Sequence, residues 1–166
     1  MYAVLYADAT IDEISPSGRK CTHVKCLGRD ILGSCTSRTR RSAFIAAFWT
    51  TNDGNIGANF SVTDSEWPGV VNYYIQHTVY VDDQPITHLL ANVSWYSPTE
   101  DRTRFHYAKP VEVWQKNAHV QLGASSYIPV QRIKCKFLQA PVTVRNRRHY
   151  AKTICLLIKL FPKISE

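Results

Sequence analysis

The chain has 166 residues, which is enough for one compact domain with a sizeable core and short for two. Its composition is 45% hydrophobic and 20% charged with 4 Trp and 9 Tyr, which excludes an intrinsically disordered protein, because such chains are poor in apolar and aromatic residues. The formal net charge of +7 favours a polyanionic partner such as nucleic acid, an acidic protein surface or an anionic membrane, although a basic surface can also serve solubility alone.

The N-terminal region lacks the features of a secretory signal, because no basic segment precedes its apolar residues and Asp8 follows soon after them. An odd number of cysteines, five, at irregular spacing indicates free thiols in a reducing compartment and no disulfide. We therefore expect a nuclear or cytoplasmic protein that is not secreted. No apolar segment reaches the roughly 18 residues that cross a bilayer, so we expect no membrane partner.

Four potential metal ligands lie close together in the sequence: Cys21, His23, Cys26 and Cys35. Zinc favours Cys and His ligands in tetrahedral sites. The spacing lacks the paired C-x-x-C unit, and a free cysteine is commonly buried in a core, so the pattern favours structural thiols over a zinc site. We expect no metal and no other cofactor.

Alternating apolar and polar residues predict strands in the middle of the chain. Residues 43–49 indicate a buried strand or a short helix, and we favour the strand. Residues 70–81 and 86–96 both alternate and are joined by a turn at 82–85, which predicts an antiparallel hairpin. The first of these two strands is expected to place one set of side chains on a single face: Val71, Tyr73, Ile75, Val79 and Val81.

A further strand is predicted at residues 131–138, with cations along one side. Its two sides carry Ile133, Cys135 and Phe137, and Arg132, Lys134 and Lys136, respectively. Residues 147–160 repeat apolar side chains at spacings of three and four, which predicts a C-terminal helix. The remaining pattern of short strands and turns favours a mainly β fold, a small β-barrel or sandwich of antiparallel strands, in a single domain over residues 1–166.

Charge is distributed unevenly along the chain. Residues 101–166 hold 13 Lys/Arg against 3 Asp/Glu, whereas residues 1–100 hold 7 against 10. Clusters of Lys and Arg neutralise phosphates and release counterions, which gives a salt-sensitive affinity for DNA or RNA. We therefore expect a nucleic-acid-binding surface in the C-terminal half, formed by Arg132, Lys134, Lys136, Arg145, Arg147 and Arg148. A further basic cluster, Arg38-Thr39-Arg40-Arg41, lies in the N-terminal half.

No motif in the sequence predicts catalysis. The chain has no G-x-x-x-x-G-K-[ST] phosphate loop, no G-x-S-x-G nucleophile turn and no H-E-x-x-H metal helix. His77 and His88 lie in the opposing strands of the predicted hairpin, but no spacing pairs a nucleophile with a base. We expect a binding module and not an enzyme.

Three segments follow one another in an order that has a parallel in a known family: Ala91-Asn92-Val93-Ser94-Trp95-Tyr96, Lys109-Pro110-Val111-Glu112-Val113-Trp114, and residues 127–137. This order resembles a bromo-adjacent homology (BAH) domain, a β-barrel module of chromatin proteins. The resemblance implies a BAH-like core at about residues 70–138, a basic tail at residues 139–166, and interaction with chromatin in the nucleus.

Some members of that family bind methylated lysine in an aromatic cage, because ring faces attract a quaternary ammonium. By position, the resemblance implies that Trp95 belongs to a peptide-binding cage, with Tyr73 or Tyr74 opposite and Glu100 or Asp101 as a nearby anion. Trp95 also shares its strand face with apolar residues such as Val93, which favours a place in the core instead.

The same segments are similar to proteins encoded within transposable elements. Two functions therefore remain open. One is a non-catalytic module that associates with chromatin or nucleic acid through its basic C-terminal half. The other is a structural or assembly protein of a virus or mobile element, in which a basic face packages nucleic acid.

Overall fold

The computed structural model describes residues 11–26, 30–38, 40–48, 66–99, 111–120, 126–145 and 151–160. This part of the chain is mainly β, with antiparallel pairing throughout, as the sequence predicted. The strands are β1 (Ile11–Cys21), β2 (His23–Cys26), β3 (Asp30–Gly33), β4 (Phe44–Phe48), β5 (Glu66–Val81), β6 (Gln84–Pro98), β7 (Val111–Val120), β8 (Tyr127–Pro129), β9 (Ile133–Arg145) and β10 (Ala151–Leu160). Two short 3-10 helices, η1 (Arg40–Ala43) and η3 (Val130–Arg132), precede β4 and β9.

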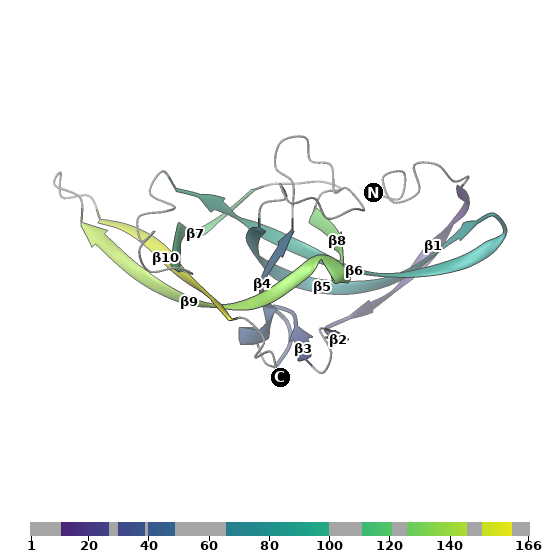
Figure 1. Cartoon of the computed structure of the whole chain (residues 1–166), viewed down its shortest axis with the longest axis horizontal. Helices are drawn as coiled ribbons and strands as arrows, with labels where there is room; N and C mark the ends of the chain where they lie inside the picture. The colour runs from purple at the N-terminus through teal and green to yellow at the C-terminus, as the bar shows by residue number, and fades with distance from the viewer. Residues whose placement is uncertain are drawn as a thin grey trace, which may run out of the picture.

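Eight of the strands form one sheet in the order β1-β5-β4-β9-β10-β7-β6-β8, and β6 also pairs with β5 (Figure 1). The pairings therefore lead from β5 through β4, β9, β10, β7 and β6 back to β5, and the sheet curls around an apolar interior. The strands β2 and β3 form a separate two-stranded sheet. Within the described residues, no helix is long and apolar enough to span a membrane.

The predicted hairpin is confirmed: β5 and β6 pair antiparallel along nearly their whole length. The turn is shorter than expected, because Val81 pairs with Gln84 and only Asp82 and Asp83 connect the strands. Both have positive φ, 50° and 59°, which matches the right-handed twist of the flanking strands in a two-residue turn. Aspartate tolerates this left-handed region better than most residues, so the sequence suits the turn.

A bulge at Asn72 changes which side chains of β5 face the interior. Val71 pairs with Val93 and Tyr73 pairs with Asn92, so Asn72 is the extra residue on its strand. As a result Tyr74 is buried and Tyr73 is partly exposed. The prediction that Tyr73 shares the buried face of Val71 is therefore wrong, because strict alternation does not hold across a bulge.

Large aromatic side chains fill the interior of the curled sheet. Trp95 and Trp114 are completely buried, and Trp67 packs edge-on against Trp114 with ring centroids 5.1 Å apart. Gly69 pairs with Trp95 across β5 and β6, and a Cβ atom at Gly69 would lie only 2.9 Å from the Trp95 ring. Glycine is therefore required at this position for the ring to be buried.

The described part of the C-terminal segment is a strand, so the helix predicted at residues 147–160 is wrong over residues 151–160. Ala151–Leu160 forms β10, which pairs with β9 along its whole length and with β7 over Ile154 to Ile158. Apolar and β-branched residues such as Ile154 and Ile158 are also common in strands. Pairing with two neighbouring strands outweighs the helical spacing of the apolar residues.

Candidate nucleic-acid interface

The row of cations predicted along β9 is only partly present. Ile133, Cys135 and Phe137 are buried as expected, and Lys134 and Lys136 are partly exposed. Arg132 is different, because only 3% of its surface is exposed. It belongs to η3, ahead of the strand, so it does not follow the strand alternation. Its predicted role as an outward phosphate contact is wrong.

Lys134 already has partners within the chain. Its ammonium group forms an ion pair with the carboxylate of Glu66, on the neighbouring part of the sheet. The same group also lies 5.4 Å from the centroid of the Phe48 ring. Arg145 ends β9, but its side chain, and all of Arg147 and Arg148, lie outside the described residues. Lys136, like Lys134, is partly exposed and lies on β9.

A second sheet, which we call the basic layer, carries most of the exposed cations among the described residues. It consists of β2, β3, residues 34–38 and η1. In Figure 1, β2 and β3 lie below β4 and β5. Val24 pairs with Leu32, and both are buried in the same core cluster as Tyr74. The next pair, Lys25 and Ile31, is exposed, so it forms the outer face of the layer.

The bulge in β5 anchors the basic layer to the main sheet. The backbone N–H of Cys35 donates to the carbonyl of Val71 at 2.8 Å, and its thiol donates to the carbonyl of Asn72 at 3.5 Å. The Tyr74 hydroxyl donates to the carbonyl of Gly33 at 3.1 Å. Because these contacts are distributed on both sides of the bulge, the layer is held in a defined position against β5.

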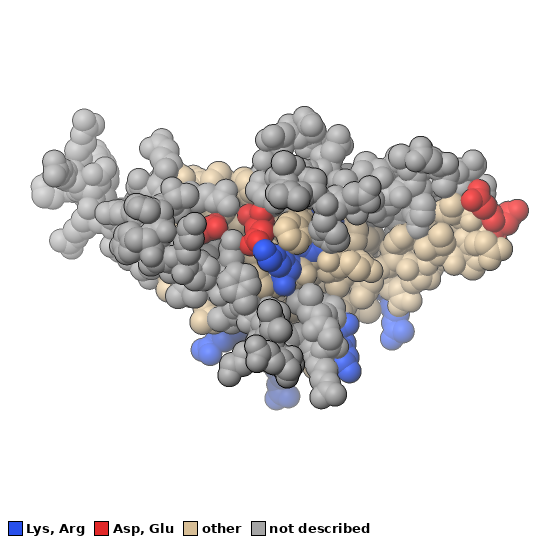
Figure 2. Space-filling model, viewed as in Figure 1, with Lys and Arg blue, Asp and Glu red and all other residues tan. Residues whose placement is uncertain are grey.

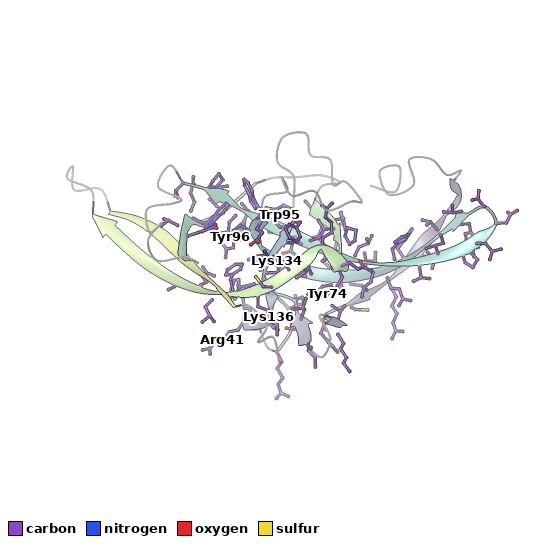
Figure 3. The ribbon with its side chains drawn as sticks, viewed as in Figure 1. Arg41, Tyr74, Trp95, Tyr96, Lys134 and Lys136 are labelled. Atoms are coloured by element: carbon purple, nitrogen blue, oxygen red, sulfur yellow. The ribbon has the colours of Figure 1, made fainter. Side chains whose placement is uncertain are left out.

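Three exposed arginines project from this anchored layer: Arg38, Arg40 and Arg41. None of them forms an ion pair with another side chain among the described residues. In Figure 2 the blue Lys and Arg side chains lie mainly along the lower side of the view, where β2 and β3 lie in Figure 1. Arg41 and Lys136 both lie on the lower side in Figure 3, and η1 contacts β9.

A local signal for this surface was present in the sequence. All 7 Lys/Arg of residues 1–100 lie between Arg19 and Arg41, where Asp30 is the single acidic residue. Because residues 1–100 carry a net negative charge, only the cluster from Arg38 to Arg41 was identified from the sequence in this part of the chain. The exposed residues Arg19 and Lys25 were missed.

The aromatic cage implied by the family resemblance is not formed. Trp95 and Tyr74 are both 0% exposed, so neither ring face is available to a methylated peptide. The bulge at Asn72 turns Tyr74 inward, and Gly69 allows the Trp95 ring to be buried. Glu100 lies outside the described residues.

Tyr73 contacts other groups of the chain. Its hydroxyl and that of Tyr127 hydrogen-bond to each other at 2.7 Å, and the ammonium of Lys20 lies 4.2 Å from the Tyr73 ring centroid. The hydrogen bond to Tyr127 raises the pKa of Tyr73, and burial adds to this rise. Tyr73 therefore remains protonated and helps to hold β1, β5 and β8 together.

The potential zinc ligands do not form a cluster in the described residues. Cys21, Cys35 and Cys135 are not in disulfides, and the Cys35 thiol donates to the backbone of β5. No group of three or more His, Cys, Asp or Glu residues in this part of the chain lies close enough to hold a metal ion. The side chain of Cys26 is outside the described set.

A histidine pair lies on the long hairpin. His77 and His88 are directly opposite each other on β5 and β6, as their places in the predicted hairpin implied. Burial lowers the pKa of His88, and the neighbouring His77 lowers it further. This pair lies nearer the turn of the hairpin than Val71, Asn72 and Tyr74, which bond to the basic layer, so it is a feature of the hairpin and not of that layer.

The geometry brings a set of exposed cations together on a small, firmly attached layer, which is suited to contacts with a polyanion. No protein-family model matches the chain, and comparisons with curated proteins and with solved structures gave no significant match.

Proposed function

We propose that this protein is a non-catalytic module that binds the phosphate backbone of nucleic acid, with the basic layer as its contact surface. The observation that carries the proposal is the set of exposed arginines, Arg38, Arg40 and Arg41, without ion-pair partners among the described residues. Such groups neutralise phosphates at little cost, because no internal ion pair has to be broken first. Lys25 and Lys136 extend the same surface.

The composition of this surface supports backbone contacts and not base recognition. Residues 19–43 contain no Phe, Trp or Tyr on which a base could stack, and no Asn or Gln to read adenine. Contacts to phosphate are insensitive to base sequence. The proposed ligand is therefore double-stranded DNA, bound with little sequence preference. The resemblance to a chromatin module agrees with this ligand and suggests the nucleus as its setting.

The test compares two triple variants that remove the same charge. In R38Q/R40Q/R41Q the arginines of the basic layer are lost, and in R145Q/R147Q/R148Q three arginines near the C-terminal end of the chain are lost. Affinity for a labelled DNA duplex is measured over about 50 to 200 mM salt. We expect the first variant to reduce the slope of log affinity against log salt by about two to three, and the second to change it much less.

Equal losses in both variants would show that net charge alone matters, which would contradict a defined interface on the basic layer. A loss confined to R145Q/R147Q/R148Q would move the interface to the C-terminal half. Circular dichroism of each variant checks that the strands are retained. A single-stranded oligonucleotide of the same length should bind more weakly than the duplex, because the layer has no ring for stacking.

A further inference from the structure

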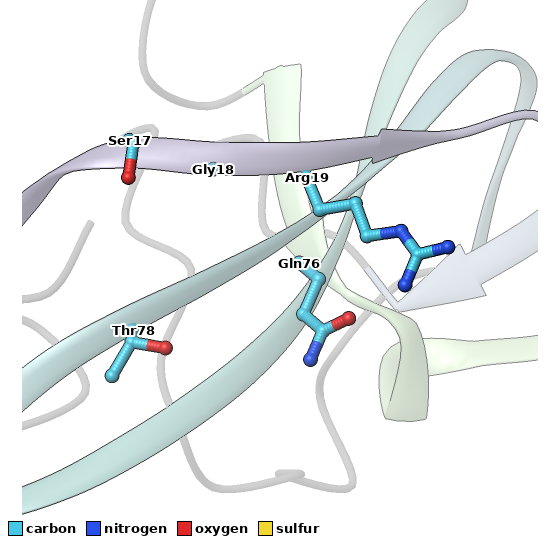
Figure 4. Close-up of a pocket in the computed structure, with 5 residues that line it drawn as sticks. All are labelled: Ser17, Gly18, Arg19, Gln76 and Thr78. Atoms are coloured by element: carbon cyan, nitrogen blue, oxygen red, sulfur yellow. The ribbon is translucent and has the colours of Figure 1, made fainter.

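An open, polar cavity lies beside the basic layer, between β1 and β5. It has a volume of about 450 Å³ and is lined by Ser17, Gly18, Arg19, Gln76 and Thr78 (Figure 4). A Cβ atom at Gly18 would lie 2.9 Å from the Ile75 side chain and 3.2 Å from the carbonyl of Gln76. Glycine at this position therefore lets β1 lie close to β5 and keeps the lining residues of the two strands together.

The cavity opens on the face of the sheet that the basic layer covers. Cys21 pairs with Tyr74 and Arg19 pairs with Gln76, so Arg19 and Gln76 lie two residues along their strands from that first pair. Residues two apart in a strand share a face. The Tyr74 hydroxyl donates to Gly33 of the basic layer, so Arg19 and Gln76 face the same side as that layer. Figure 4 shows both side chains pointing the same way.

The described lining residues present hydrogen-bond donors, and none of these five residues carries a carboxylate. Arg19 provides a guanidinium group with five N–H donors, and Gln76 provides an amide. The Thr78 hydroxyl shares a hydrogen bond of 3.1 Å with that of Thr87, and when Thr87 is the donor in this bond the Thr78 hydroxyl can donate to a ligand. A guanidinium beside hydroxyl and amide donors matches the oxygens of a phosphate group.

We propose that this cavity is a phosphate-binding site, in which Arg19 pairs with the phosphate and Gln76 and Thr78 donate hydrogen bonds to its oxygens. As part of a DNA interface, this site rests on the proposed function and extends that function. A duplex bound to the basic layer would continue past β3 and place one backbone phosphate in the cavity. The same chemistry would also accept a phosphate from a free anion, and the two sources are separated by the measurements below.

The first measurement compares R19Q with K20Q. The two residues are neighbours on β1, both are exposed and each substitution removes one positive charge, but Lys20 pairs with Ile75 and its ammonium lies over Tyr73, on the other face of the sheet. For a labelled DNA duplex, we expect R19Q to reduce the salt slope by about one and K20Q to leave it unchanged.

The second measurement uses inorganic pyrophosphate as a free ligand and follows the thermal unfolding midpoint. If the cavity holds phosphate, pyrophosphate raises the midpoint of the wild type and of K20Q, but not that of R19Q. T78V should weaken this effect while T87V retains it, because Thr87 shares the internal hydrogen bond but does not line the cavity.

A loss of duplex affinity specific to R19Q supports the site with a backbone phosphate as its ligand. A pyrophosphate effect that depends on Arg19, without any duplex effect, supports the same site with a free anion. If the wild type shows no salt-dependent duplex binding but still responds to pyrophosphate through Arg19, the proposed function fails and the site stands. Equal behaviour of R19Q and K20Q in both measurements overturns the site.

Discussion

The aromatic interior and the basic layer satisfy their polar groups in opposite ways. In the interior, the indole N–H of Trp67 donates to the carbonyl of Tyr96 at 2.8 Å, and that of Trp114 donates to the Glu112 carboxylate at 2.9 Å. In the basic layer, Arg40 and Arg41 are exposed and form no ion pair among the described residues. One region has internal partners for its donors, whereas the other presents its donors to solvent.

This difference separates residues that maintain the fold from residues that are available to a ligand. Lys134 and Arg41 are both cations, but Lys134 is held by Glu66 and Arg41 is not held by any described side chain. A buried donor without a partner costs free energy, so internal pairing is expected wherever side chains leave water. An exposed cation is hydrated at little cost and is free to exchange water for an anion. Substitutions in the two regions should therefore have different consequences.

The largest expected difference concerns stability. W95A removes a completely buried indole ring from the interior and should lower the free energy of unfolding by about 3–5 kcal/mol. R41Q, in the basic layer, should change it by no more than about 0.5 kcal/mol, because the side chain is exposed. Urea-induced unfolding, followed by tryptophan fluorescence, measures both. A W95A protein as stable as R41Q would place Trp95 outside the core and revive the cage hypothesis.

The hairpin could be predicted because its cause is local. Alternating residues in β5 and β6 and a short acidic turn identify both strands and their pairing. The bulge at Asn72 depends on contacts that are distant in the sequence, among them the bonds of Cys35 to the carbonyls of Val71 and Asn72. No local pattern reveals those contacts, so the sequence predicted the strand but assigned Tyr73 to the wrong face.

Exposed cations were expected, but the sequence did not indicate where most of the described ones lie. The positive charge of residues 101–166 favoured a basic face that includes Arg132, but Arg132 lies in a 3-10 turn and is buried. The helix prediction for residues 151–160 was wrong for a similar reason. The spacing of their apolar residues fits a helix, but pairing with β9 and β7 stabilises a strand. In both places the tertiary neighbours decide the outcome, and these are not visible in a short window.

The second prediction tests the connection between the two regions. Y74F removes the hydroxyl that donates to Gly33 but keeps the buried ring, and it should lower the free energy of unfolding by about 1 kcal/mol. Loss of this anchor should also accelerate hydrogen exchange at residues 32–35 of the basic layer more than in the centre of β6.

Y73F is the matched control, because it removes a hydroxyl from the adjacent, partly exposed tyrosine that bonds to Tyr127 and not to the basic layer. Exchange at residues 32–35 should be the same in Y73F as in the wild type. If Y74F and Y73F change that exchange equally, the Tyr74 hydroxyl does not anchor the layer.

The smallest expected effect is a pH dependence that belongs to the hairpin and not to the basic layer. Burial and the neighbouring His77 lower the pKa of His88 in the folded protein. Below the ordinary histidine pKa of about 6.5, the unfolded chain therefore binds more protons at this position than the folded chain does. The stability contributed by neutral His88 is complete above that pH and is lost as the pH falls toward the lowered folded-state pKa.

The free energy of unfolding, measured from about pH 7.5 down to about pH 5, should thus fall more steeply in the wild type than in H88Q, which has no titrating group at this position. H77Q should remove only the smaller contribution, because burial remains the larger cause of the lowered His88 pKa. H23Q, which changes an exposed histidine of the basic layer, should keep the pH dependence of the wild type. Because carboxylates also begin to titrate near the lower limit, the difference between wild type and H88Q is the quantity to follow. If that difference is independent of pH, His88 is not desolvated in the hairpin and acidification acts on other groups.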